Sequence, residues 1–140
     1  MIFFKIKGGF VEKKIDKYKI DWDGPSASKF QFNCKQFFKK YWEKHHVYEE
    51  LPCFGCGTER PLRMDLFSLN KRICVEVNGD FHTRETSFFH NKQSDFLDQI
   101  ARDEIKRNWL KLNKITLVEV FPNDLPLSLE KLEKIYGEIF

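Results

Sequence analysis

The segment 63–78 contains two short runs of strand-forming residues separated by an Asn-Lys pair. This pattern predicts a β-hairpin with a two-residue turn. In that register Phe67 lies opposite Cys74, and Asp65 lies opposite Glu76 on the same face of the sheet. Two carboxylates about 4 Å apart repel each other by roughly 4 kcal/mol at an effective dielectric constant near 20. The hairpin therefore predicts a positive charge close to these acids.

Two sources of that charge are compatible with the sequence. In one, an acid is solvated at a sheet edge or pairs with Arg63 or Arg72, which belong to the same hairpin. In the other, Asp65 and Glu76 hold a divalent metal ion, because hard cations such as Mg²⁺ prefer carboxylate oxygens as ligands. The residues that follow the hairpin favour the metal.

Polar residues that suit a catalytic site continue beyond the second strand. Asn78 lies two positions after Glu76. His82 comes shortly after the glycine that follows Asn78. A helix predicted from about residue 94 to 112 then contains Asp103 and Lys106. An apolar stripe on this helix is predicted at positions 101, 105 and 112, while Asp103 and Arg107 are spaced as a surface ion pair.

In their order along the chain, these residues resemble the PD-(D/E)XK nuclease superfamily, and within it the very-short-patch-repair and small homing-type endonucleases. The similarity covers roughly residues 28–120. It implies an α/β (α+β) fold with a restriction-endonuclease-like core of helix, three strands, helix and strand. It also implies a hydrolase that cleaves DNA with Mg²⁺, for which Mn²⁺ substitutes. The residues to which the resemblance assigns catalysis are Asp65, Glu76, Asn78, His82, Asp103 and Lys106, with Asp65 and Glu76 as metal ligands.

One position departs from the pattern of that superfamily. Asn78 stands where a lysine is usual, and an amide orients water but does not take up a proton near neutral pH. His82 is the best replacement as a general base, because imidazole titrates near neutrality. Lys106 is the alternative source of the missing cation. The first helix offers Gln31 where related nucleases place an acid, and either Glu49 or Glu50 faces the same side as the hairpin acids.

The net charge of +3 is too small to indicate a nucleic-acid partner by itself, but lysines are concentrated in the first third of the chain. They form either a solvated face or a surface for DNA phosphates. The segment 80–93 is long and polar enough to enter a DNA groove, and its His90 is a secondary catalytic candidate. The residues predicted to contact DNA are Lys29, Arg63, Arg84, Lys92 and Arg107.

The four cysteines, at positions 34, 53, 56 and 74, are expected to be free thiols. Cys53 and Cys56 form a single CxxC motif without a second ligand pair at zinc-finger spacing. A structural zinc site is therefore not favoured, since it would require Cys34 or the histidines at 45 and 46 to approach the motif. The support for a redox pair is equally weak, because the motif lies in a turn and not at the start of a helix.

The sequence predicts one compact domain, since 41% hydrophobic and 16% aromatic residues suit a folded core. A basic, strand-rich extension over residues 1–27 contains a hairpin, with strands at 2–7 and 10–22, and precedes a nuclease-like core over 28–140. Within that core we expect a helix at 29–44 with Ser28 as its N-cap and Gln31 completing a capping box. Strands are predicted at 46–51 and 114–121, and a final helix at 129–139.

No apolar run approaches membrane-spanning length, so we expect no membrane partner and a cytoplasmic location in a bacterial or phage-infected cell. DNA is the predicted partner, and a homodimer is possible because one chain has one active site. Three alternatives stay open: a DNA-binding module that keeps the nuclease fold without cleavage, a structure-specific nuclease for junctions or mismatches, and an interaction protein with an aromatic N-terminal docking surface.

Overall fold

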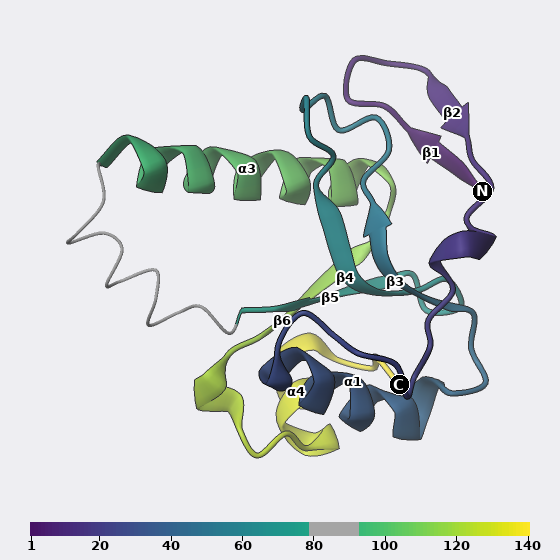
Figure 1. The fold of residues 1–140 in the computed structure, drawn as a ribbon, viewed down its shortest axis with the longest axis vertical. Helices are drawn as coiled ribbons and strands as arrows, with labels where there is room; N and C mark the ends of the chain where they lie inside the picture. The colour runs from purple at the N-terminus through teal and green to yellow at the C-terminus, as the bar shows by residue number, and fades with distance from the viewer. Residues whose placement is uncertain (79–92) are drawn as a thin grey trace.

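The computed structural model describes the backbone of residues 1–78 and 93–140, and the side chains of these residues except 93–96. This part of the chain is of mixed α and β class, as predicted, with two sheets and three α-helices (Figure 1). Its strands are β1 (Ile2–Phe4), β2 (Phe10–Glu12), β3 (Val47–Pro52), β4 (Arg63–Ser68), β5 (Ile73–Val77) and β6 (Thr116–Val120). Its helices are α1 (Lys29–Trp42), α3 (Gln93–Leu112) and α4 (Leu129–Tyr136), with short 3-10 turns at Asp16–Tyr18 and Pro122–Asp124.

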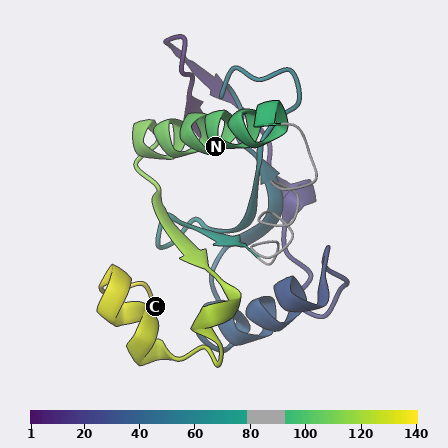
Figure 2. The same cartoon turned by 90° about the vertical axis from the view of Figure 1, so that its left-hand side faces the viewer.

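The main sheet has the strand order β3-β4-β5-β6. The first three strands are antiparallel, whereas β6 runs parallel to β5. A parallel neighbour requires a crossover connection, and α3 provides it. Figures 1 and 2 show α3 on one side of this sheet and α1 with α4 on the other.

Strand alternation divides the core between the two faces of the sheet. On the side of α1 and α4, Leu66, Val75 and Val118 are cross-strand neighbours in one buried cluster. On the side of α3, Phe67 and Cys74 are neighbours in a second cluster that contains Trp109 of the helix. Glu76 follows Cys74 by two positions in β5, so its side chain also points towards α3.

The predicted hairpin register is confirmed, because Phe67 is paired with Cys74. The predicted length of the turn is wrong, because the turn spans four residues, 69–72, instead of two. Arg72 leaves the strand pairing with a left-handed φ of 52°. Its guanidinium donates a hydrogen bond to the carbonyl of Asn113 at 2.5 Å, which ties the turn to the end of α3.

Helix α1 begins where the sequence predicts. The hydroxyl of Ser28 accepts a hydrogen bond from the backbone N–H of Gln31 at 3.0 Å, as an N-cap should. The capping box is incomplete, because the Gln31 side chain donates instead to Glu50 at 3.2 Å. The helix ends at Trp42, two residues before the predicted end at 44.

Helix α3 occupies the predicted range, but its predicted apolar stripe is wrong at two of three positions, because only Ile105 packs against the core. Ala101 is exposed and Leu112 is 42% exposed, while the buried residues are Trp109 and Leu110. The indole N–H of Trp109 donates to the carbonyl of Phe54 at 2.8 Å. Contacts made by the C-terminal half of the helix therefore decide which face is buried, and the regular periodicity of the sequence does not show this.

The N-terminal hairpin is shorter than predicted, with strands of three residues each. Its Phe3 and the following Ile15 are buried in the same cluster as Trp109. Strand β6 and helix α4 are likewise a few residues shorter than their predicted ranges. Among the described residues, no helix combines the length and apolar character that crossing a membrane would require.

Candidate functional site

Acidic residues occupy corresponding positions on neighbouring strands of the main sheet. Glu76 on β5 is directly paired with Glu119 on β6. The register of β4 against β5 places Asp65 across from Glu76, although the regular pairing stops one residue earlier. The Asp65 carboxylate instead accepts a hydrogen bond from the backbone N–H of Val77 at 2.8 Å. The predicted juxtaposition of Asp65 and Glu76 is therefore present, and Glu119 adds a third acid beside them.

Glu76 lies in an environment that disfavours its negative charge. Its side chain is only 15% exposed. Burial raises the pKa of Glu76 to about 8, and the neighbouring Asp65 adds to this effect by its charge and by a hydrogen bond. The ammonium of Lys106 acts in the opposite direction, because it forms an ion pair with the Glu76 carboxylate. Near neutral pH a proton, Lys106 or a metal ion can therefore neutralise the Glu76 carboxylate.

Lys106 reaches this site from α3. This position is the one expected if Lys106 supplies the cation that Asn78 lacks. Its ammonium contacts the Glu76 carboxylate and donates to the backbone carbonyl of Arg63. Burial alone would lower the pKa of Lys106, but the adjacent Glu76 more than offsets burial, so that the pKa is raised above its usual value. Lys106 therefore keeps its positive charge at neutral pH and is unsuited to accept a proton.

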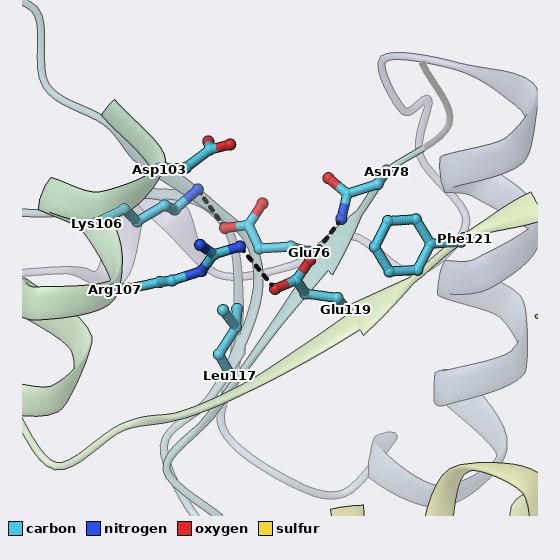
Figure 3. Close-up of a pocket in the computed structure, with 8 residues that line it drawn as sticks. All are labelled: Glu76, Asn78, Asp103, Lys106, Arg107, Leu117, Glu119 and Phe121. Atoms are coloured by element: carbon cyan, nitrogen blue, oxygen red, sulfur yellow. Dashed lines mark hydrogen bonds and ion pairs between the residues drawn. The ribbon is translucent and has the colours of Figure 1, made fainter. Parts of the chain in front are cut away.

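A second polar network lies on the other side of Glu76 (Figure 3). The Asn78 amide donates a hydrogen bond to the Glu119 carboxylate at 3.1 Å. The guanidinium of Arg107 approaches the other oxygen of the same carboxylate at 3.4 Å. Arg107 is thus paired with Glu119 and not with Asp103, whose carboxylate accepts instead from Gln99 at 3.0 Å. The predicted ion pair between residues 103 and 107 is wrong, because the neighbouring strand offers Arg107 another partner.

A surface pocket brings most of these side chains together, four of them from the predicted catalytic set (Figure 3). Its lining residues are Glu76, Asn78, Asp103, Lys106, Arg107, Leu117, Glu119 and Phe121. Glu119 was missed by sequence reasoning. The available signal was an acid inside a predicted apolar strand, but only the parallel pairing with β5 places it beside Glu76.

The two acids of β3 face different partners. Glu49 forms an ion pair with the fully buried Lys35 of α1 at 3.1 Å. Burial raises the pKa of Glu50, and the charge of Asp65 contributes to this rise, while the hydrogen bond from Gln31 lowers it. Glu50 is therefore the β3 acid on which the charge of Asp65 acts, and its hydrogen-bond partner is Gln31 of α1. Its left-handed φ of 54° interrupts the regular strand at this point.

The remaining predicted residues are less closely tied to the pocket. Lys29 is exposed in the first turn of α1, and Arg63 is exposed at the start of β4. The predicted roles of His82, Arg84, His90 and Lys92 concern residues outside the described part of the chain.

The carboxylates of the site meet only part of what a divalent metal ion needs. Within residues 1–78 and 93–140, no group of three or more His, Cys, Asp or Glu side chains is arranged to hold a metal. Asp65 and Glu76 nevertheless suit a hard cation as two of its oxygen ligands, with water and substrate oxygens supplying the others. The raised pKa of Glu76 supports this fit, because a cation beside it would relieve the repulsion from Asp65.

The cysteines are all free and buried in this part of the structure. The backbone N–H of Cys56 donates to the carbonyl of Cys53 at 3.2 Å, which closes the CxxC segment into a turn. Burial raises the pKa of Cys53 to about 12. Cys34 belongs to the core cluster on the opposite face of the sheet, so it does not approach the CxxC turn.

Two curated viral proteins are similar to part of this chain. The first is the "Uncharacterized protein 307L" of Invertebrate iridescent virus 6, with 37% identity over 59 residues, which are 42% of this chain and 30% of that protein. The second is the "Uncharacterized protein 033L" of Invertebrate iridescent virus 3, with 35% identity over 71 residues, 51% of this chain and 36% of that protein. The chain thus spans about a third of the length of these relatives. No family model matches it, and no solved structure gives a significant match.

Proposed function

We propose that this protein is a metal-dependent DNA endonuclease with a restriction-endonuclease-like core. The observation that carries the proposal is the position of Asp65 and Glu76 across from each other, with Lys106 on Glu76. The element order α1, β3, β4, β5, α3, β6 is the order of helix, three strands, helix and strand that such a core requires. Two acids that can hold a metal ion, with a lysine beside them to stabilise charge on a phosphate, suit metal-assisted phosphodiester hydrolysis.

In this proposal Asp65 and Glu76 hold Mg²⁺, with Mn²⁺ able to replace it. Bound there, the ion would neutralise charge on the scissile phosphate and lower the pKa of a water molecule. Glu76 must first lose the proton that its raised pKa retains at neutral pH. The buried position of Glu76 beside Asp65 thus favours cation binding. When no cation is bound, the same position destabilises the charged form of Glu76.

Each polar residue in the pocket has a distinct task. Lys106 stays protonated, so it stabilises negative charge that develops on the phosphate and does not act as the base. Asn78 orients water through its amide, and Glu119 fixes the position of that amide. His82 is proposed as the general base. His82→Ala should then lower the single-turnover rate by about 100-fold to 10,000-fold, with metal affinity nearly unchanged.

DNA would reach the pocket along its exposed basic residues. The Arg107 side chain is 58% exposed at the pocket and pairs with Glu119, so it can contact a phosphate without breaking this ion pair. Lys29, Arg63, Arg84 and Lys92 are proposed as further phosphate or base-edge contacts. One chain has one such site, so cleavage of both strands would need a homodimer or two successive nicks.

A DNA-binding module without cleavage is the second candidate, and the ion pair between Lys106 and Glu76 favours it. There the lysine, and not a metal, supplies the positive charge that the acids need. Divalent metal binding discriminates the two candidates, because the module would have no specific affinity for Mn²⁺.

The test is cleavage of supercoiled, linear, mismatched and branched DNA in Mg²⁺ or Mn²⁺, with EDTA as the control. Asp65→Asn and Glu76→Gln should abolish cleavage and keep DNA binding, whereas Asp98→Asn, at an exposed acid of the same helix as Lys106, should leave both unchanged. Cleavage that continues in EDTA would contradict the metal mechanism. No cleavage of any of these substrates, together with no Mn²⁺ affinity, would favour the binding module.

A further inference from the structure

The N-terminal hairpin presents apolar side chains to solvent on its outer face. Phe4 is paired with Phe10, and Ile2 is paired with Glu12. Phe4 and Ile2 are each 50% exposed and Phe10 is 62% exposed. Strand alternation turns the intervening Phe3 inward, where it is fully buried. Two aromatic side chains thus lie side by side on a surface that no other described element covers.

This face is held firmly in place by its inner side. The ring of Phe3 stacks on Trp109 with centroids 5.7 Å apart. The backbone N–H of Phe4 donates to the Asn113 side chain at 2.7 Å, and the Asn113 amide donates back to the Phe4 carbonyl at 3.1 Å. The backbone N–H of Ile6 donates to the carbonyl of Gly55 at 3.0 Å. The exposed rings therefore stay on an anchored support and do not fold into the core.

The segment that contains the exposed rings is rich in lysine, although the ammonium of Lys13 lies over the inner ring of Phe54, 5.5 Å from its centroid. Residues 1–14 contain four exposed lysines, Lys5, Lys7, Lys13 and Lys14, against one acid, Glu12. This short segment has as much net positive charge as the whole chain. Rigid aromatic rings within a basic surface match the two features of single-stranded nucleic acid, which are the flat faces of its bases and its phosphates.

The hairpin is also fixed to the helix that supplies the proposed active site. Asn113, which binds Phe4, follows the last residue of α3, and Lys106 lies seven positions before it. At 1.5 Å of rise per residue, this separation is about 10 Å along the helix axis. One nucleic acid can therefore contact both the pocket and the hairpin.

We propose that the outer face of this hairpin, formed by Ile2, Phe4 and Phe10, is a stacking surface for unpaired nucleic-acid bases. Phe4 and Phe10 stack on the bases, and lysines of residues 1–14 other than Lys13 bind the phosphates. The inference rests on the proposed nuclease function and narrows its substrate to DNA with a single-stranded or locally unpaired segment. Fully paired DNA has no free base faces to offer this surface.

The test compares binding of the full chain in EDTA to a fluorescent single strand and to the duplex of the same sequence. Phe4→Leu/Phe10→Leu keeps the surface apolar but removes the stacking rings, and Ile135→Ala is the control, because Ile135 is 63% exposed on α4. We expect wild type to prefer the single strand. The double variant should lose about tenfold or more of that affinity, with little change for the duplex. 2-Aminopurine in the single strand should be quenched by wild type and less by the double variant.

Two results would overturn the inference: equal affinity of wild type for both DNA forms, or unchanged single-strand binding and quenching by the double variant. If the double variant instead only dissociates a dimer, measured by light scattering, the face is a contact between two copies of this chain and the inference is wrong. Thermal unfolding of each variant checks that the fold is intact. Because binding is measured in EDTA, it is independent of cleavage, so failure of the nuclease proposal is recognised separately.

Discussion

The Lys106 ammonium on α3 contacts the Glu76 carboxylate on β5, and this contact joins the crossover helix to the acidic end of the hairpin. Glu76 has Asp65 on one side and Glu119 on the other, and because Arg107 pairs with Glu119, Lys106 is left to balance both Asp65 and Glu76. The pKa of Glu76 stays raised, to about 8, in spite of this contact. The predictions below follow from this imbalance of charge.

Glu76→Gln should stabilise the protein more as the pH rises. A carboxyl whose pKa is raised from 4.5 to about 8 on folding stabilises the folded state below pH 4.5, and this contribution is lost as the pH rises towards 8. The neutral glutamine does not undergo this loss. The difference in melting temperature between variant and wild type should therefore increase between pH 5 and pH 8 and stay constant above. A difference that does not change with pH would show that the pKa of Glu76 is ordinary.

Mg²⁺ or Mn²⁺ affinity should rise with pH in the same range. Below pH 8, a metal that binds Glu76 must displace one proton, so the affinity should increase about tenfold per pH unit and level off above pH 8. Isothermal titration calorimetry in buffers of different ionisation enthalpy measures the released proton directly. Metal binding without proton release would contradict a raised pKa at the metal site.

Lys106→Met should separate metal binding from catalysis. Removing the ammonium takes away a competitor for Glu76 but also raises the pKa of Glu76 further, so Mn²⁺ affinity should be equal or tighter well above pH 8, where Glu76 is ionised in both proteins. The single-turnover rate should fall by about 100-fold or more, because the charge that stabilises the phosphate is gone. Lys111→Met, at an exposed lysine of the same helix, is the matched control and should change neither quantity. If Lys106→Met lowers both the Mn²⁺ affinity and the single-turnover rate, Lys106 is needed for the fold of the site.

Glu119→Ala should slow cleavage through the residues that Glu119 positions. It removes the acceptor for Asn78 and the ion-pair partner of Arg107, and the loss of such supporting contacts typically costs about 10-fold to 100-fold. Glu119→Gln keeps an acceptor for Asn78 and should recover part of the rate. Equal rates for the alanine and glutamine variants would show that the hydrogen bond to Asn78 has no influence. Far-ultraviolet circular dichroism serves as the folding control.

The local features of the fold were predictable because each depends on neighbouring residues. The pairing of Phe67 with Cys74 follows from the period of two in adjacent strands, and Ser28 caps α1 through a contact only three residues away. The position of Asp65 across from Glu76 follows from the same register. The four-residue turn was not predictable, because Arg72 is held by Asn113, which is distant in sequence.

Local sequence patterns were enough to predict the two facing acids, the order of helices and strands, and the presence of Lys106 on the crossover helix. The tertiary structure was needed to show that Lys106 contacts Glu76, that Glu119 joins the same row, and that the charge of Asp65 acts on Glu50. It also decided that Arg107 pairs with Glu119 and that Phe4 stays exposed. The physical reason is that these contacts depend on the parallel pairing of β5 with β6 and on how α3 lies over the sheet, and neither is encoded in local periodicity.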